Sequence, residues 1–252
     1  MLTLSASPIW AQTVSHSQEV VVVMGSSTSW VGGNGCDNAD GWTYWFAKAY
    51  CPGKMRSYAR SGATWTHTAA TKLNTKDSTA LLADDNVMYN QVARLLEDVR
   101  NGRMASPTLA LLYAGTNDVW FEIKRAGALK EPVDEALSKP YDPTRPMGSY
   151  TGLASSIGLS VGALREAFPG IRIVLITPTE ITKVSEGKTA QVGDYIERCG
   201  RRLGVEVIRM DRESPIRRAE ELKAPHYTRD GVHPTREASK MTGQKIAKMI
   251  NK

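Results

Sequence analysis

Cysteine is scarce in this chain of 252 residues, which contains only Cys36, Cys51 and Cys199. These three match no zinc-binding spacing, so neither a metal nor another cofactor is expected from them. Two interpretations remain open for the thiols. Cys36 and Cys51 pair across a short loop and helix if the protein is exported, or all three cysteines are unpaired.

Long apolar runs and long basic runs are also missing. No stretch approaches the roughly 20 apolar residues that cross a bilayer, so no membrane span is expected. The net charge of +6, from 32 Lys+Arg and 26 Asp+Glu, could favour an anionic substrate or surface, but the basic residues are scattered. Without a basic run or a recognition module, nucleic acid is not an expected partner.

The N-terminus has only part of a secretory signal. The segment 2–12, LTLSASPIWAQ, is apolar and small, but it lacks a basic n-region and a full apolar h-region. We interpret residues 1–18 as a signal-peptide remnant, which predicts a periplasmic or secreted protein. The alternative is an N-terminal arm, and a cytoplasmic location then stays open.

Short apolar runs alternate with segments of helical periodicity, and no repeat interrupts them. The runs are continuous rather than alternating, which is typical of strands covered on both faces of a parallel sheet. They predict strands at 20–24, 55–59, 108–114, 171–177 and 205–210. The intervening segments predict helices at 41–49, 86–101, 150–168, 187–204 and 235–250, with Asn86 as an N-cap and Gly102 as a stop.

This alternation indicates a single α/β domain over residues 19–252 with a mostly parallel sheet. The segment 121–149, which contains Pro132, Pro140, Pro143 and Pro146, predicts a surface excursion near the functional site. In an open parallel sheet, ligands bind beyond the carboxyl ends of the strands. The residues that follow each predicted strand are therefore the candidates for the functional site.

Those residues include the components of an acyl-transfer site. Two hydroxyls, Ser26 and Ser27, follow the first strand, and Gly62 follows the second. Asn117 and Asp118 follow the third strand. A turn with Asp230 and His233 precedes the last helix. Together they can supply a nucleophile, oxyanion donors, a base and a group that orients the base.

Each component also has a plain structural interpretation. Gly62 and Asn117 are ordinary turn residues, and an Asp-x-x-His turn alone is weak evidence of catalysis. Asp118 is expected to hold its loop by accepting backbone N–H bonds. Of the other histidines, His67 and His226 are interpreted as surface residues rather than site neighbours.

The order of these residues along the chain favours the catalytic interpretation over the structural one. VVVMGSST, SGAT, GTND and DGVHP, in this order from about residue 20 to 235, resemble the SGNH, or GDSL, hydrolase family. The resemblance implies a flavodoxin-like, three-layer α/β/α sandwich with a five-stranded sheet and no metal or organic cofactor. It also implies roles: Ser27 as nucleophile, His233 as base, Asp230 as its partner, and Ser27 N–H, Gly62 and Asn117 as the oxyanion hole.

One position departs from the family pattern. The Gly-Asp-Ser of the family is Gly25-Ser26-Ser27 here, so either hydroxyl is a candidate nucleophile, and the register of the block favours Ser27. The missing aspartate is not a member of the triad. The change also leaves open a relative that has lost activity and only binds carbohydrate.

The expected substrate is a small-molecule or carbohydrate ester. Trp30, Trp65 and Trp120 each follow one of the blocks and are candidates for a substrate rim that stacks on sugar rings. With the expected export and no long apolar lid, this favours hydrolysis of carbohydrate O-acetyl groups. The alternative is a short-chain lipase, lysophospholipase or thioesterase, and the oligomeric state is left undetermined.

Overall fold

Five parallel strands form the centre of the protein. The computed structural model describes residues 16–77 and 80–251. The strands are β1 (His16–Gly25), β2 (Pro52–Ser57), β3 (Leu109–Tyr113), β4 (Arg172–Ile176) and β5 (Glu206–Ile208), in the order β2-β1-β3-β4-β5. This is the flavodoxin-like order, and it confirms the predicted fold class.

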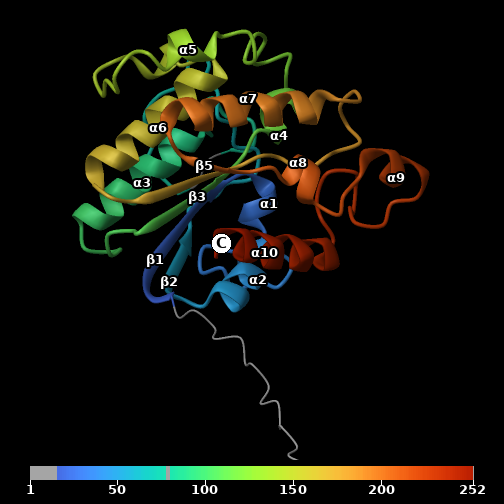
Figure 1. Cartoon of the computed structure of the whole chain (residues 1–252). Coiled ribbons are helices and arrows are strands. Elements are labelled where there is room, and N and C mark those ends of the chain that lie inside the picture. Colours follow the sequence, from blue (N-terminus) through green and yellow to red (C-terminus); the bar gives the residue numbers. More distant parts are fainter. Residues whose placement is uncertain (1–15, 78–79, 252) are drawn as a thin grey trace, which may run out of the picture.

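Helices cover both faces of the sheet (Figure 1). Successive side chains of β1 point to opposite faces, so Val22 and Met24 pack beneath one helical layer while Val21 and Val23 pack beneath the other. The first layer contains α3 (Met88–Arg100), α6 (Leu153–Ala167) and α7 (Lys188–Leu203). The second contains α2 (Trp42–Tyr50) and α10 (Arg236–Ile250), which lie against each other.

The long helices begin and end close to the predicted residues. Gly102, at φ +68°, follows α3 as the predicted stop. Asn86 is not the N-cap of α3, a position that Val87 occupies without a side-chain bond. Its side-chain amide donates instead to the carbonyls of Ser61 and Leu81, at 2.7 and 3.0 Å, and so joins two parts of the loop before α3.

Short helices occupy the connections. They are α1 (Ser27–Trp30), α4 (Thr116–Trp120), α5 (Val133–Ala136), the 3₁₀ turn η1 (Met147–Ser149), α8 (Met210–Glu213) and α9 (Arg218–Lys223). The excursion at 121–149 is irregular apart from α5 and η1. Arg125 donates to the carbonyl of Thr66, so the start of the excursion contacts the loop that follows β2. Leu137 and Tyr141, further on, pack against Gly158 and Gly162 of α6.

The structure bears on the expectations about the N-terminal arm and the cysteines. The strand β1 begins at His16, so the sheet includes residues assigned to the arm; the rest of the signal-like segment, residues 1–15, lies outside the described residues. All three cysteines are free, and no Cys36–Cys51 disulfide is found.

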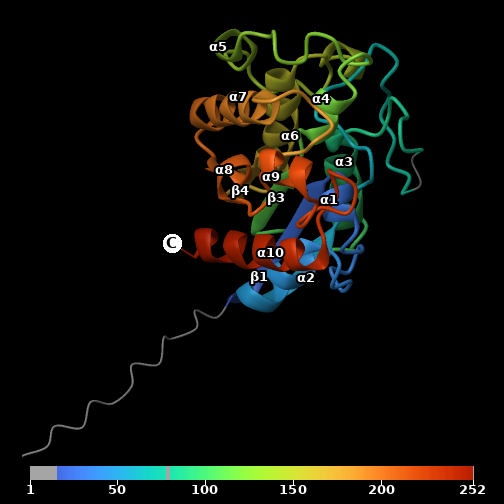
Figure 2. The ribbon, with the colours of Figure 1, turned by 90° about the vertical axis from the view of Figure 1, so that its right-hand side faces the viewer.

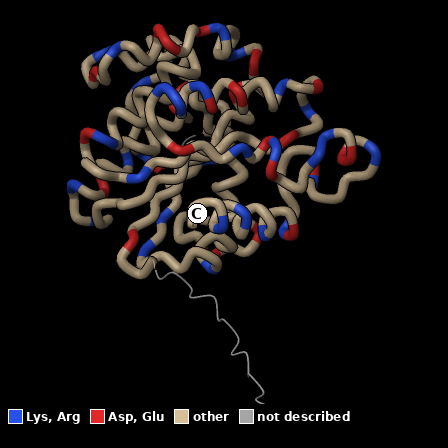
Figure 3. The backbone as a smooth tube through the Cα atoms, viewed as in Figure 1, with Lys and Arg blue, Asp and Glu red and all other residues tan. Residues whose placement is uncertain are grey.

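Within residues 16–77 and 80–251, no helix has the length and apolarity to cross a membrane. Charges of both signs are interspersed along the chain (Figure 3).

Candidate active site

The candidate site lies where the strand order reverses. β1 and β3 are hydrogen-bonded neighbours, with Gly25 paired to Tyr113, yet β2 lies on the other side of β1. Crossovers therefore leave β1 and β3 in opposite directions, and open α/β sheets bind ligands beyond the carboxyl ends of the strands at such a point. α1, which begins with Ser27, follows β1 after one residue, and α4, which contains Asn117, follows β3 after two residues. Both helices therefore start at this edge of the sheet (Figure 2).

Three predicted residues form one hydrogen-bonded chain. His233 Nε2 is 2.9 Å from Ser27 Oγ, and His233 Nδ1 is 2.7 Å from Asp230 Oδ2. A carboxylate can only accept, so Nδ1 carries the proton and Nε2 is left to accept from the Ser27 hydroxyl. This is the arrangement in which a histidine can remove a proton from a serine.

The structure distinguishes the two serines. Ser26 is the N-cap of α1, and its carbonyl accepts from the N–H groups of Ser29 and Trp30. The contact with His233 is made by Ser27 and not by Ser26. Both side chains are buried, with 8% of Ser27 and 2% of Ser26 exposed.

The turn that carries Asp230 and His233 is closed by its own backbone. Arg229 N–H donates to His233 O, and Thr235 N–H donates to Tyr227 O. Burial disfavours the charge on Asp230, but the backbone and ring N–H groups of His233 and the N–H of Val232 outweigh it and lower the pKa of the carboxyl. Asp230 is therefore ionised at neutral pH and able to stabilise a protonated His233.

The predicted oxyanion-hole residues retain hydrogen-bond donors without acceptors. In the described part of the chain, no group accepts from the backbone N–H of Ser27 or of Gly62. Gly62 has φ +80°, and a Cβ there would collide with the carbonyl of Leu81, so this loop requires glycine. The Asn117 amide donates one proton to the carbonyl of Ala63 at 2.8 Å and keeps a second proton free.

Asp118 joins the two loops that carry these donors. Its carboxylate accepts from the N–H groups of Trp65 and Thr66, at 3.1 and 2.9 Å, and from the Thr66 hydroxyl at 2.7 Å. Asp118 thus accepts backbone N–H bonds as expected, but it holds the loop after β2 rather than its own loop. Complete burial raises the pKa of Asp118, against the opposing effect of these bonds and of Arg125.

Two residues that support the site were not predicted from the sequence. The buried Gln91 of α3 accepts from Gly25 N–H at 2.8 Å and donates to Gly25 O at 2.9 Å, which fixes the end of β1. Glu221 of α9, 3% exposed, accepts from the N–H groups of Tyr227 and Thr228 and so anchors the turn before His233. Glutamine and glutamate on polar helices carry no distinguishing signal in a single sequence.

The proposed rim is only partly compatible with the structure. Trp65 is 1% exposed and belongs to the core, because the Asp118 bonds to its own N–H and to Thr66 draw this segment inward. The rim position predicted for it is therefore wrong. Trp30, the last residue of α1, is 49% exposed. Trp120 is half-buried and lines a shallow hollow with Ile123, Val184 and Lys188.

The remaining histidines divide between surface and interior. His226 is exposed, as expected, but His67 is 2% exposed, so its prediction as a surface residue is wrong. Its Nδ1 lies 2.8 Å from the carbonyl of Met147. Burial is the main cause that lowers the pKa of His67 to about 4, and the residue is neutral at pH 7.

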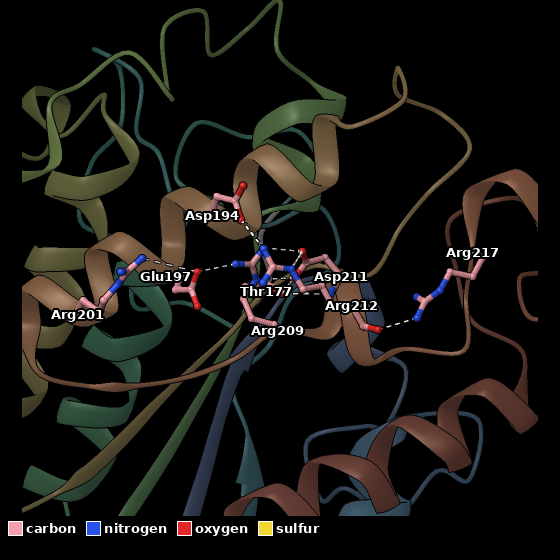
Figure 4. Close-up of polar contacts among 8 residues, drawn as sticks. All are labelled: Thr177, Asp194, Glu197, Arg201, Arg209, Asp211, Arg212 and Arg217. Carbon is pink, nitrogen blue, oxygen red and sulfur yellow. Dashed lines mark hydrogen bonds and ion pairs between the residues drawn. The ribbon is translucent and has the colours of Figure 1, made fainter.

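A second polar cluster occupies the same edge of the sheet, beyond β4 and β5 (Figure 4). Arg209 donates to Asp211, Asp194 and Glu197 at 2.7 to 2.9 Å. Asp211 also accepts from the Thr177 hydroxyl at 2.6 Å. The charges in this cluster are balanced internally, so we regard it as structural.

Known structures resemble the whole domain. A carbohydrate acetylesterase family member from Sinorhizobium meliloti aligns with a TM-score of 0.58 and 16% identity, over 92% of this chain and 97% of that one. A possible lipase from Chitinophaga pinensis aligns with a TM-score of 0.57 and 13% identity, over 92% and 98%. At these identities the likeness supports the fold alone.

The sequence comparisons give the family. Comparison with curated protein sequences gives no match. The sequence model of one family matches residues 23–241, which include the first block from Val23 onward, the other three blocks in full and every residue of the Ser27–His233–Asp230 chain. The chain therefore belongs to the GDSL-like Lipase/Acylhydrolase family.

Proposed function

We propose that the protein is a serine ester hydrolase that works through an acyl-enzyme. The observation that carries this proposal is the chain from Ser27 Oγ through His233 to Asp230, at 2.9 and 2.7 Å. Membership in an acylhydrolase family supports the same reaction class.

The mechanism follows from the positions of these groups. His233 Nε2 takes the proton of Ser27 as Oγ attacks the ester carbonyl, and Asp230 stabilises the imidazolium that forms. The oxyanion receives hydrogen bonds from Ser27 N–H, Gly62 N–H and the free proton of Asn117. His233 then protonates the leaving alcohol, and water repeats the sequence on the acyl-enzyme.

We propose acetyl groups on carbohydrates as the substrate class. Trp30 is exposed at the end of the short helix α1 that begins with the nucleophile, and its indole face can stack on a sugar ring. The similar structure of a carbohydrate acetylesterase family member is in line with this choice. Export, proposed from the signal-like N-terminus, would place the protein where such polymers occur.

A short-chain lipase or thioesterase is the second candidate, and a specific observation favours it. Leu81 and Leu82 are each more than half exposed, and the carbonyl of Leu81 lies against Gly62. Apolar side chains beside the oxyanion donors could bind a longer acyl chain. Rates on acetyl, butyryl and octanoyl esters, compared with release of acetate from acetylated xylan, distinguish the two candidates.

Ser27→Ala and Ser26→Ala together test the nucleophile. We expect Ser27→Ala to lower turnover on an acetyl ester by about 10⁴-fold or more, as loss of a triad member does. Ser26→Ala should retain most of its activity, because Ser26 does not contact His233. A fluorophosphonate should label the wild type and Ser26→Ala but not Ser27→Ala. An unlabelled wild-type protein would instead favour a relative that only binds carbohydrate.

A further inference from the structure

Arginine side chains gather in a cavity beyond the end of β2 that the ester chemistry does not use. The cavity has a volume of about 180 Å³ and lies between the loop after β2, the loop before α3 and the face of α3. It is lined by Arg56, Arg60, Arg94 and Arg103, with Asp77, Glu97 and Asp98 as the acidic residues and Asn34 on one side. None of the residues Ser27, Asp230 and His233 lines it.

Two of these arginines are buried and use their donors mainly on neutral groups. Arg94, 6% exposed, donates to the carbonyls of Lys76 and Tyr58, at 3.0 and 2.7 Å. Arg60, 7% exposed, donates to the carbonyl of Asp77 and to the side chain of Asn34. Carbonyl oxygens satisfy N–H donors, but they do not neutralise a guanidinium charge.

The positive charge is incompletely balanced. Within the described residues, Arg94 has no carboxylate within 4.0 Å, and its buried Nε has no partner, nor has the Nε of Arg56. Burial, followed by repulsion from Arg94 and Arg56, lowers the pKa of Arg60 to about 10. Burial also lowers the pKa of Arg94 to about 10. Both groups are still charged at pH 7, so the cluster favours an added negative charge.

The acidic residues around the cavity do not balance the four arginines equally. Asp98 is engaged by Tyr58, Arg56 and Arg103, so it balances the outer arginines. Asp77 contacts Arg60 from an exposed position, with 66% of its side chain accessible. A surface carboxylate of this kind can move away at low cost, and it now occupies one of the positions on Arg60 that an anion would take.

We propose that this cavity is a binding site for a compact oxyanion, a carboxylate, sulfate or phosphate group, held between Arg56, Arg60 and Arg94. Guanidinium groups bind such anions through paired, charge-assisted hydrogen bonds. The anion can be a free ion or an acidic substituent of the substrate. Arg60 connects the cavity to the ester site, because its N–H donates to the carbonyl of Gly25 and Gly62 follows two residues later.

Titration with inorganic phosphate at constant ionic strength tests the site without reference to catalysis. We expect saturable binding to the wild type by calorimetry. Asp77→Asn removes a competing negative charge and should bind phosphate more tightly, whereas Arg56→Gln should bind it about tenfold more weakly, the loss expected for one charge-assisted hydrogen bond. Both residues are partly exposed, so both variants should fold.

Arg201→Gln is the matched control, because Arg201 is an exposed arginine on α7, outside the cavity. It should bind phosphate like the wild type. The proposal is overturned if neither the wild type nor Asp77→Asn shows saturable binding. It is equally overturned if Arg201→Gln weakens binding as much as Arg56→Gln.

A second arm identifies the source of the anion, and this arm alone rests on the proposed hydrolysis. The KM for acetylated oligogalacturonate, which carries carboxylates, is compared with the KM for acetylated xylo-oligosaccharide, which is neutral. If the acidic ester has the lower KM and Arg56→Gln removes this difference, the result supports the site and assigns the anion to the substrate. Equal KM values with saturable phosphate binding support the site and assign it to a free ion.

Discussion

Two arginine clusters lie beyond the carboxyl ends of strands in the same sheet, and their charges are balanced differently. The side chains of Arg60, after β2, and Arg209, after β5, are each 9% exposed. Three carboxylates surround Arg209, and two of them raise its pKa, first through the bond to Asp211 and then through the bond to Asp194. Burial and neighbouring arginines lower the pKa of Arg60.

Burial alone therefore does not separate structural from functional polar groups. The useful distinction is whether their hydrogen bonds and charges are satisfied within the protein. Around Arg209 the side-chain donors and charges are satisfied by neighbouring carboxylates, whereas the backbone N–H groups of Ser27 and Gly62 have no acceptor in the described part of the chain. The predicted oxyanion-hole residues after β1 and β2 thus retain unused donors, unlike the arginine cluster after β5.

Arg209→Met is the strongest test of the balanced cluster. It would leave Asp211, whose side chain is 1% exposed, with only the long 3.9 Å ion pair to Arg212, so we expect a loss of about 3–5 kcal/mol in the free energy of unfolding. Denaturant titration measures this loss, and turnover per folded molecule should be unchanged. Arg212→Met is the control, because Arg212 is exposed and its ion pairs are worth less than about 1 kcal/mol. Equal losses in the two variants would contradict a structural role.

Asn117→Ala tests the predicted oxyanion-hole residues. We expect turnover to fall by about 10²–10³, because one oxyanion donor is lost, with a much smaller change in KM. Some stability is also lost, since the bond to the carbonyl of Ala63 disappears. Steady-state kinetics on an acetyl ester, combined with thermal unfolding, separate these effects. Unchanged turnover would remove Asn117 from the oxyanion hole.

The fold was predictable from the sequence because its signals are local. The continuous run at Val21–Val23 indicates a strand covered on both faces, and the parallel order follows from the alternation of strands and helices. The blocks at Ser27, Asn117 and His233 were found in the same way, since each follows a predicted strand or precedes a predicted helix.

The burial of Trp65 and His67 and the arginine cavity could not be predicted, because they depend on contacts between residues that are distant in sequence. Trp65 and His67 follow a motif, and proximity in sequence does not show that Asp118 draws their loop into the core. Arg60 and Arg94 are 34 positions apart, and each alone is an ordinary basic residue. Only the packing of α3 against the loop after β2 shows that their charges share one cavity.

Glu221 gives the smallest and most specific test, because its buried carboxylate is satisfied by hydrogen bonds yet anchors the turn that carries His233. Burial disfavours its charge, but the Thr228 hydroxyl and the N–H groups of Tyr227, His226 and Thr228 outweigh burial and lower its pKa below the ordinary 4.5. Its contribution to stability is thus complete above pH 4.5 and is lost as the pH falls through the lowered pKa.

Glu221→Gln should therefore cost about 1–3 kcal/mol at pH 7, because an amide NH₂ replaces an oxygen that accepts N–H donors. The difference from the wild type should shrink as the pH falls below 4.5, which denaturant titrations across this range would measure. Glu220→Gln, at the exposed neighbouring position, should show neither effect. A pH-independent loss in Glu221→Gln would mean that the carboxylate charge does not hold the turn that positions His233.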